Sequence, residues 1–266
     1  MPSVSALHVY PIKSCRALDL KASRFDRLGP LYDRRFMLVD DTGKFLTQRT
    51  VPRMALITPR LGPMALQVSA PDMQPLKVAM TQRDARRIEV TVWGHSGAAE
   101  DLGDHVADWF STFLERTCRL VRFPEDGVRQ VSSRHTDIPA QVAFADGYPA
   151  LLISEASLAD LNGRLEQKLP MSRFRPNIVV SGCDAYAEDG WKRIRIGELV
   201  LDLVKPCGRC EITTVDQITG AVAKEPLTTL ASYRARDNEV LFGQNCVHHE
   251  PGSLRVGDSV EVIETR

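Results

Sequence analysis

Short runs of alternating apolar and polar residues, separated by turn residues, make up about the first 95 positions of the chain. An alternation of period two predicts strands with one buried face, and the Gly, Pro and Asp between the runs predict turns. The pattern is typical of a barrel or a sandwich. We therefore expect eight strands in this part: Val4–Ile12, Leu18–Arg24, Arg35–Asp40, Phe45–Arg49, Met54–Thr58, Leu66–Ser69, Leu76–Met80 and Ile88–Trp93.

Two later segments follow the 3.6-residue period of a helix instead. In Asp104–Arg116 the large apolar residues recur every three or four positions. The second helix is predicted to begin near Ser154, because serine favours the position before a first helical turn. Its apolar stripe consists of Leu158, Leu161, Leu165 and Leu169. Between the helices we expect a strand at Cys118–Phe123 and a polar loop over residues 124–147, whose length is typical of a lid or binding loop.

The remainder of the chain returns to strand patterns, with one short helix at Leu227–Tyr233. The expected strands are Asn177–Ser181, Lys192–Ile196, Leu199–Val204, Glu211–Val215, Ala221–Val222, Val240–Val247 and Ser259–Ile263. The fold class is therefore mainly β with a few helices, that is, α+β. We place an N-terminal β-rich domain at residues 1–95 and a second domain at residues 96–266, with the boundary between 95 and 125.

Composition narrows the class of protein. The 34 basic and 34 acidic residues cancel, so no overall basic field favours nucleic acid. No apolar run approaches the roughly 18 residues of a membrane span, and the first residues lack the pattern of a signal peptide. Six scattered cysteines do not form a disulfide framework. We therefore expect a protein of the reducing cytoplasm that binds neither nucleic acid nor membrane.

The stretch KPCGRCEITTVD contains the pair Cys207 and Cys210. A thioredoxin-like redox pair is disfavoured, because the β-branched run that follows does not favour a helix. A zinc site that adds Cys246 and His248 is conceivable, although its second half has an uncommon spacing. Two small buried residues at a turn are a third interpretation.

A fourth interpretation is a single thiolate bound to a soft metal whose other ligands come from a cofactor. If that cofactor carries phosphate, anion-binding side chains must lie nearby. The residue types that suit this role are Lys13, Ser14, Arg35, Arg49, Arg173 and Arg175. Spacing alone leaves these four interpretations open.

Several motifs occur along the chain in a recognisable order: YPIKSC, DRRFMLVD, FLTQR, LLISEASLADLN, RFRPNIVVSG, CGRCEITTVD, LFGQN and PGSLRVGD. Together they resemble the MOSC family, in which a MOSC β-barrel domain is joined to a smaller N-terminal β-barrel domain. The likeness is greatest to the amidoxime-reducing components and to bacterial reductases of N-hydroxylated bases, and it extends over residues 4–264.

This resemblance implies a molybdenum cofactor, a pterin with two thiolates on the metal and a terminal phosphate. It implies that Cys210 binds the metal and that Cys207 is only a neighbour. The cofactor contacts that it implies are Lys13, Ser14, Arg35, Arg175 and Asn177, together with backbone contacts from Asp146, Gly147 and Tyr148. Arg173, as an anion-binding residue type, and Thr213, just past the implied metal ligand, are further candidates. An arginine fork suits phosphate or a polar pterin edge, and an asparagine can both donate and accept there.

Asp216 lies just beyond the implied metal ligand. It is a candidate for moving protons during catalysis. The alternative is that Asp216 only begins the turn in DQITG.

The implied activity is reduction of small N-oxygenated compounds such as hydroxylaminopurines, amidoximes and hydroxylamines. The fused ferredoxin-like domain of some relatives is not in this sequence, so we expect electrons from a separate protein: a ferredoxin, a flavodoxin, or a cytochrome with its reductase. The alternative function is a molybdenum cofactor carrier or sulfur-handling module without reductase turnover.

Overall fold

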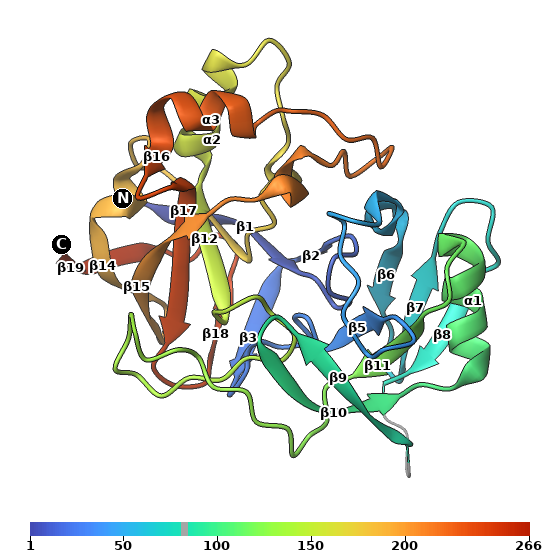
Figure 1. Cartoon of the computed structure of the whole chain (residues 1–266). Helices are drawn as coiled ribbons and strands as arrows, with labels where there is room; N and C mark the ends of the chain where they lie inside the picture. The colour runs from blue at the N-terminus through green and yellow to red at the C-terminus, as the bar shows by residue number, and fades with distance from the viewer. Residues whose placement is uncertain (81–84) are drawn as a thin grey trace.

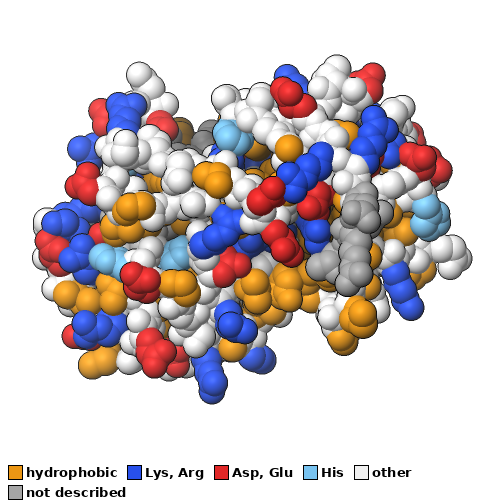
Figure 2. Space-filling model, turned by 90° about the horizontal axis from the view of Figure 1, so that it is seen from below, with side chains coloured by type: hydrophobic (Ala, Val, Ile, Leu, Met, Phe, Trp, Pro, Cys, Tyr) orange, Lys and Arg blue, Asp and Glu red, His pale blue; other side chains and the backbone are white. Residues whose placement is uncertain are grey.

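The structure is a computed structural model that describes residues 1–80 and 85–266. Strands predominate and form four sheets, with three α-helices in the described part of the chain (Figure 1). The predicted class, mainly β with helices, is confirmed. Basic and acidic side chains are interspersed over the face seen in Figure 2, consistent with the balanced charge of the sequence.

The largest sheet contains strands from both ends of the chain. Its order is β19 (Val260–Thr265), β14 (Trp191–Ile196), β15 (Leu199–Gly208), β17 (Glu239–His248), β12 (Ala150–Ser154), β13 (Ile178–Ser181), β1 (Ser3–Val9) and β2 (Leu18–Leu20), and β16 (Ala235–Arg236) pairs with β17. The antiparallel pairing of β1 with β13 places the first strand in the sheet of the C-terminal half. The domain boundary between 95 and 125 stays a prediction.

Two smaller sheets and a helix form the other half of the molecule (Figure 1). One has the order β5 (Phe36–Val39), β11 (Arg119–Arg122), β10 (His95–Asp101), β9 (Arg87–Val92), and the other β6 (Thr58–Leu61), β7 (Ala65–Ser69), β8 (Leu76–Ala79). Helix α1 (Asp104–Leu114) packs its apolar face on this part, with Phe110 and Phe113 in the shared core. A fourth sheet joins β18 (Gly252–Arg255), β3 (Ala22–Asp26) and β4 (Gly29–Pro30).

Helices α2 (Glu155–Arg164) and α3 (Leu227–Arg234) lie together on one side of the large sheet (Figure 1). Ser154 caps α2 as predicted, and its hydroxyl accepts a hydrogen bond from the Ser157 amide. The helix ends at Arg164, so the expected extension through Leu169 is wrong. None of the described helices is long and apolar enough to cross a membrane.

Two expected strands are short 3-10 helices. The segment Glu211–Val215 forms a 3-10 turn over Glu211–Thr214, because the hydroxyls of Thr213 and Thr214 bond to carbonyl groups three residues earlier. The segment Met54–Thr58 lies mostly in a 3-10 turn over Pro52–Leu56, whose proline suits the first position of a helical turn. Further 3-10 turns occur at Met171–Arg173 and Ala187–Gly190.

Other differences follow from strands with atypical patterns. Phe45–Arg49 forms only a single bridge to Val39, and Ala221–Val222 only a bridge to Val215. Leu18–Arg24 divides into β2 and β3, which belong to different sheets. Strand β10 was not expected, because HSGAAED lacks apolar alternation, and β12 was missed because it is buried throughout.

Candidate functional site

A pocket lies where loops of the N-terminal half meet the large sheet. Its lining comes from the turn after β1, the turn before β5, the loop between β5 and the Pro52–Leu56 turn, the loop before β12 and the start of β12. The segment before β13, the end of β15 with the turn that follows it, and β17 complete the lining. The lining residues are Lys13, Ser14, Arg34, Thr47, Arg49, Ala145, Asp146, Gly147, Tyr148, Ala150, Leu151, Phe174, Arg175, Asn177, Cys207, Gly208, Arg209, Cys210, Ile212 and Asn245.

Positive charge dominates this lining. Its cationic side chains are Lys13, Arg34, Arg49, Arg175 and Arg209. Asp146 is the single carboxylate among the lining residues, all of which lie in the described part of the chain. A pocket with this balance favours an anionic ligand, and its arginine forks suit phosphate or a polar heterocycle.

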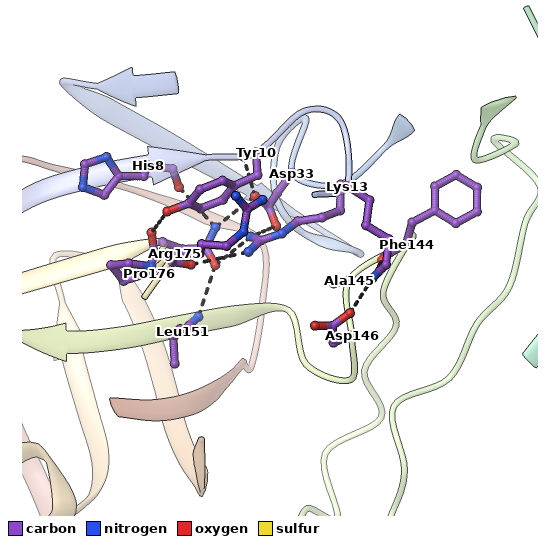
Figure 3. A network of polar contacts seen from close by, with 12 residues as sticks. His8, Tyr10, Lys13, Asp33, Phe144, Ala145, Asp146, Leu151, Arg175 and Pro176 are labelled. Carbon is purple, nitrogen blue, oxygen red and sulfur yellow. Dashed lines mark hydrogen bonds and ion pairs between the residues drawn. The ribbon is translucent and has the colours of Figure 1, made fainter. Parts of the chain in front are cut away.

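Lys13 and Asp146 form an ion pair at one wall (Figure 3). The Lys13 ammonium also donates to the carbonyl oxygen of Phe144 at 2.8 Å, and the Trp93 indole donates to Asp146 at 3.0 Å. Desolvation opposes ionisation of Asp146, but the charge and hydrogen bond of Lys13, together with the Trp93 indole and the charge of Arg34, hold the pKa of the carboxyl below its usual range. Burial lowers the pKa of Lys13, and Asp146 offsets only part of that effect.

Arg34, Arg175 and Asn177 form the adjoining wall. Asn177 donates to the Asp33 carboxylate at 3.0 Å and accepts from Arg34 at 3.2 Å. Arg175 is 8% exposed and donates to the carbonyl oxygen of Cys15 at 2.8 Å. Burial, followed by repulsion from Arg34, lowers the pKa of Arg175 to about 10. These contacts fix the two guanidinium groups before any ligand arrives.

Three lining residues have left-handed backbone conformations although none is glycine. The φ angles are 63° at Ser14, 46° at Arg34 and 57° at Arg175. Such conformations are uncommon for residues with side chains and cluster at functional sites. Their grouping at one pocket supports a binding role.

Both cysteines of the pair line the pocket. The Cys210 thiol is exposed and lies 3.0 Å from Nη1 of Arg49, while the Cys207 sulfur lies 3.0 Å from Nη1 of Arg209. Nε of Arg209 is buried and has no hydrogen-bond partner in the described part of the chain. The pocket thus offers an accessible sulfur ligand and an unused cationic donor, which fits a group that combines a soft metal with anionic or acceptor atoms.

The four-residue zinc site is not formed. Among residues 1–80 and 85–266, no group of three or more His, Cys, Asp or Glu is arranged to hold a metal. Cys246 is buried in β17 and His248 contacts the carbonyl oxygen of Asp26 at 2.8 Å. A thioredoxin-like start of an α-helix is absent too, because β15 ends at Gly208 and a four-residue 3-10 turn follows Cys210.

The pocket brings together nine of the predicted site residues: Lys13, Ser14, Arg49, Asp146, Gly147, Tyr148, Arg175, Asn177 and Cys210. Four predicted residues are not among its lining: Arg35, Arg173, Thr213 and Asp216. Arg35 is held away by Asp26, whose two carboxylate oxygens lie 2.6 and 2.8 Å from its Nη2.

The other three support the segment that follows Cys210. Arg173 donates to the carbonyl oxygen of Thr213 at 3.3 Å and to the Asp216 carboxylate at 2.9 Å. Asp216 also accepts from the amides of Ile218 and Thr219, as expected of a residue that begins a turn. These contacts favour a structural role for Asp216, and its catalytic role stays a prediction.

Sequence reasoning missed Arg34 and Arg209 as site residues. Arg209 lies between the two cysteines, so its position was a usable signal. Arg34 precedes the predicted Arg35. In the structure Arg34, with a left-handed backbone, lines the pocket, while Asp26 holds Arg35 away from it.

Comparison with known proteins gives two consecutive domain matches. Residues 1–117 match the MOSC N-terminal beta barrel domain, and residues 139–261 match the MOSC domain. The chain is 39% identical to mitochondrial amidoxime-reducing component 1 of Mus musculus, over 98% of this chain and 82% of the relative. It is 37% identical to mitochondrial amidoxime-reducing component 1 of Homo sapiens, over 98% and 83%.

Proposed function

The chain belongs to the MOSC family, among the amidoxime-reducing components, and on this basis we propose that it is a molybdenum cofactor-dependent reductase of N-hydroxylated compounds. The observation that carries the proposal is one pocket that joins an exposed thiol to five cationic side chains. A thiolate suits the metal, and the cations suit the phosphate and the polar ring of a pterin.

Particular residues would hold the cofactor. Cys210 would supply the protein's sulfur ligand, and Arg49, which donates to that sulfur, would stabilise its negative charge. Lys13, Arg34 and Arg175 would bind the anionic part, while Asn177 would offer a donor and an acceptor to a heterocycle. Arg173 would keep the Cys210 segment in place through the Thr213 carbonyl.

When bound, the cofactor would supply the two-electron chemistry that converts R–NHOH, two electrons and two protons into R–NH₂ and water. The chain's own contribution is ligation, orientation and a strongly cationic surrounding. Electrons would come from a separate protein, a ferredoxin, a flavodoxin or a cytochrome with its reductase. We place the protein in the cytoplasm.

Metal analysis tests the cofactor assignment. In protein made in a molybdenum-replete host, we expect about one molybdenum per chain, lost in Cys210→Ala and retained in Cys207→Ala. The matched cysteine variant controls for general effects of removing a thiol from this pocket. Stoichiometric zinc in place of molybdenum would contradict the proposal.

Turnover separates the reductase from the alternative of a cofactor carrier or sulfur-handling module. Molybdenum-loaded protein with an artificial electron donor should reduce hydroxylaminopurine or benzamidoxime, with product measured by chromatography. Loaded protein that shows no turnover on any N-hydroxylated compound would favour the carrier.

A further inference from the structure

Tyr10 contacts two cationic side chains of the pocket at once. The guanidinium carbons of Arg34 and of Arg175 each lie 4.2 Å from the centre of its ring. Its hydroxyl donates to the carbonyl oxygen of Pro176 at 3.0 Å, which ties the ring to the segment that carries Arg175 (Figure 3). One aromatic ring therefore links two pocket arginines that are far apart in the sequence.

Tyr10 is only 1% exposed, yet it makes several contacts with charged and polar groups. Within the described part of the chain it belongs to none of the four apolar core clusters. Its backbone amide donates to the Asp33 carboxylate at 2.9 Å. The contacts of the ring that distinguish Tyr10 from the clustered core residues are therefore those with the two guanidinium groups.

The two guanidinium groups repel one another, and only one has an acidic partner. Arg34 pairs with Asp33 at 2.5 Å. Arg175 forms no ion pair with any carboxylate of the described residues, and its Nη1 donates to the carbonyl oxygen of Cys15. A buried cation without a counter-ion is costly, and the face of an aromatic ring offsets part of that cost.

We propose that Tyr10 is a positioning residue, whose ring holds Arg34 and Arg175 together as one binding site for an anionic group. Arg175 has no acidic partner among the described residues, so the site is complete only when a ligand supplies its counter-ion. The inference rests on the proposed function only in taking that group to be the phosphate of the cofactor. The geometry itself requires only an anion.

The test measures the affinity of cofactor-free, full-length protein for inorganic pyrophosphate by isothermal titration calorimetry. We expect Tyr10→Leu to weaken binding about tenfold, because both guanidinium groups lose the ring face that holds them in place. Tyr10→Phe, which keeps the ring and removes the hydroxyl, should stay within about threefold of the wild type. Rescue by phenylalanine distinguishes a role of the ring from a role of the hydroxyl.

A destabilising control excludes a general effect on folding. Phe110 is a fully buried aromatic in the other half of the molecule, and Phe110→Leu should lower the melting temperature without changing pyrophosphate affinity. Should Tyr10→Leu fail to fold, the weaker changes Arg34→Gln and Arg175→Gln serve instead. If the two arginines act as one site, the fold-loss of affinity in the double variant Arg34→Gln, Arg175→Gln should be smaller than the product of the fold-losses in the two single variants.

Three results would overturn the inference: equal affinity in Tyr10→Leu and the wild type, equal losses in Tyr10→Phe and Tyr10→Leu, or independent effects of the two arginine changes. A wild type that does not bind pyrophosphate would overturn it as well. None of these would remove the proposed function, which depends on the molybdenum content of the wild type and of Cys210→Ala.

Discussion

The charge of Arg175 depends strongly on its surroundings. This residue faces Arg34, Tyr10, Cys15 and Asp33, and its pKa is lowered to about 10 by burial and by Arg34. Because the folded chain releases this proton at a lower pH than the unfolded chain, the charge opposes folding at neutral pH. That penalty is relieved as the pH rises above about 10.

The pH dependence of anion binding has the opposite sign to the pH dependence of stability. Binding needs the charged guanidinium, so pyrophosphate affinity should fall as the pH rises through about 10. Lys13, whose pKa burial also lowers, should add to the fall. Calorimetry at a series of pH values checks this. Arg175→Gln should bind more weakly throughout and show a smaller pH effect, whereas a wild-type affinity that is constant through pH 10 would contradict the assignment.

At the scale of elements, the β9–β10 hairpin reaches from the N-terminal half to the pocket. At its tip Trp93 is 45% exposed and has a left-handed backbone with φ 54°. Its ring lies under the Arg49 guanidinium at 4.6 Å, and its indole donates to Asp146. The hairpin therefore connects Arg49, which donates to the Cys210 sulfur, with the loop before β12 that contains Asp146.

We expect Trp93→Ala to loosen that loop, because Asp146 loses a donor and Arg49 loses the ring that orders it. Hydrogen exchange at residues 145–148 should become faster, by up to about tenfold for a loss on the order of 1 kcal/mol. Trp109→Ala is the matched control, since Trp109 also makes one indole hydrogen bond, to Gln74 on a distant surface. Unchanged exchange at 145–148 would show that the hairpin does not support the loop.

At the scale of the whole molecule, the C-terminal half depends on the start of the chain. Strand β1 pairs with β13. The Val4 amide of β1 donates to the carbonyl oxygen of Asp258, and the Val260 amide donates to the carbonyl oxygen of Pro2, just before β1. Val4 and Leu7 lie in the core of the large sheet. Each buried apolar side chain contributes about 1.5–3 kcal/mol, so losing this strand removes a large part of a typical domain stability of about 5–15 kcal/mol.

A fragment of residues 139–266 should therefore fail to fold alone, although it contains the matched MOSC domain. Joining residues 1–31 to it through a flexible linker should restore cooperative thermal unfolding, measured by circular dichroism. The same fusion with Leu7→Asp should not restore it. Cooperative unfolding of the isolated fragment would mean that β1 is dispensable.

Part of the site could be predicted because binding chemistry depends on residue type. The order of motifs led to eight of the lining residues, Cys210 and Lys13 among them. The sequence could not separate Arg34 from Arg35, because the left-handed backbone at Arg34 and the contact of Arg35 with Asp26 are set by the tertiary structure. The turn after Cys210 was also predicted wrongly, because β-branched residues favour strands until their hydroxyls bond to the backbone.

The sequence by itself determined the fold class, the family and the residue types of the pocket, because periodicity and motif order are local properties of a chain. Only the tertiary structure decided that β1 belongs to the second half, that Arg35 is occupied by Asp26, and that Tyr10 joins two arginines. These contacts connect residues that are distant in the sequence. Their geometry follows from how the strands pair and pack, which no local pattern specifies.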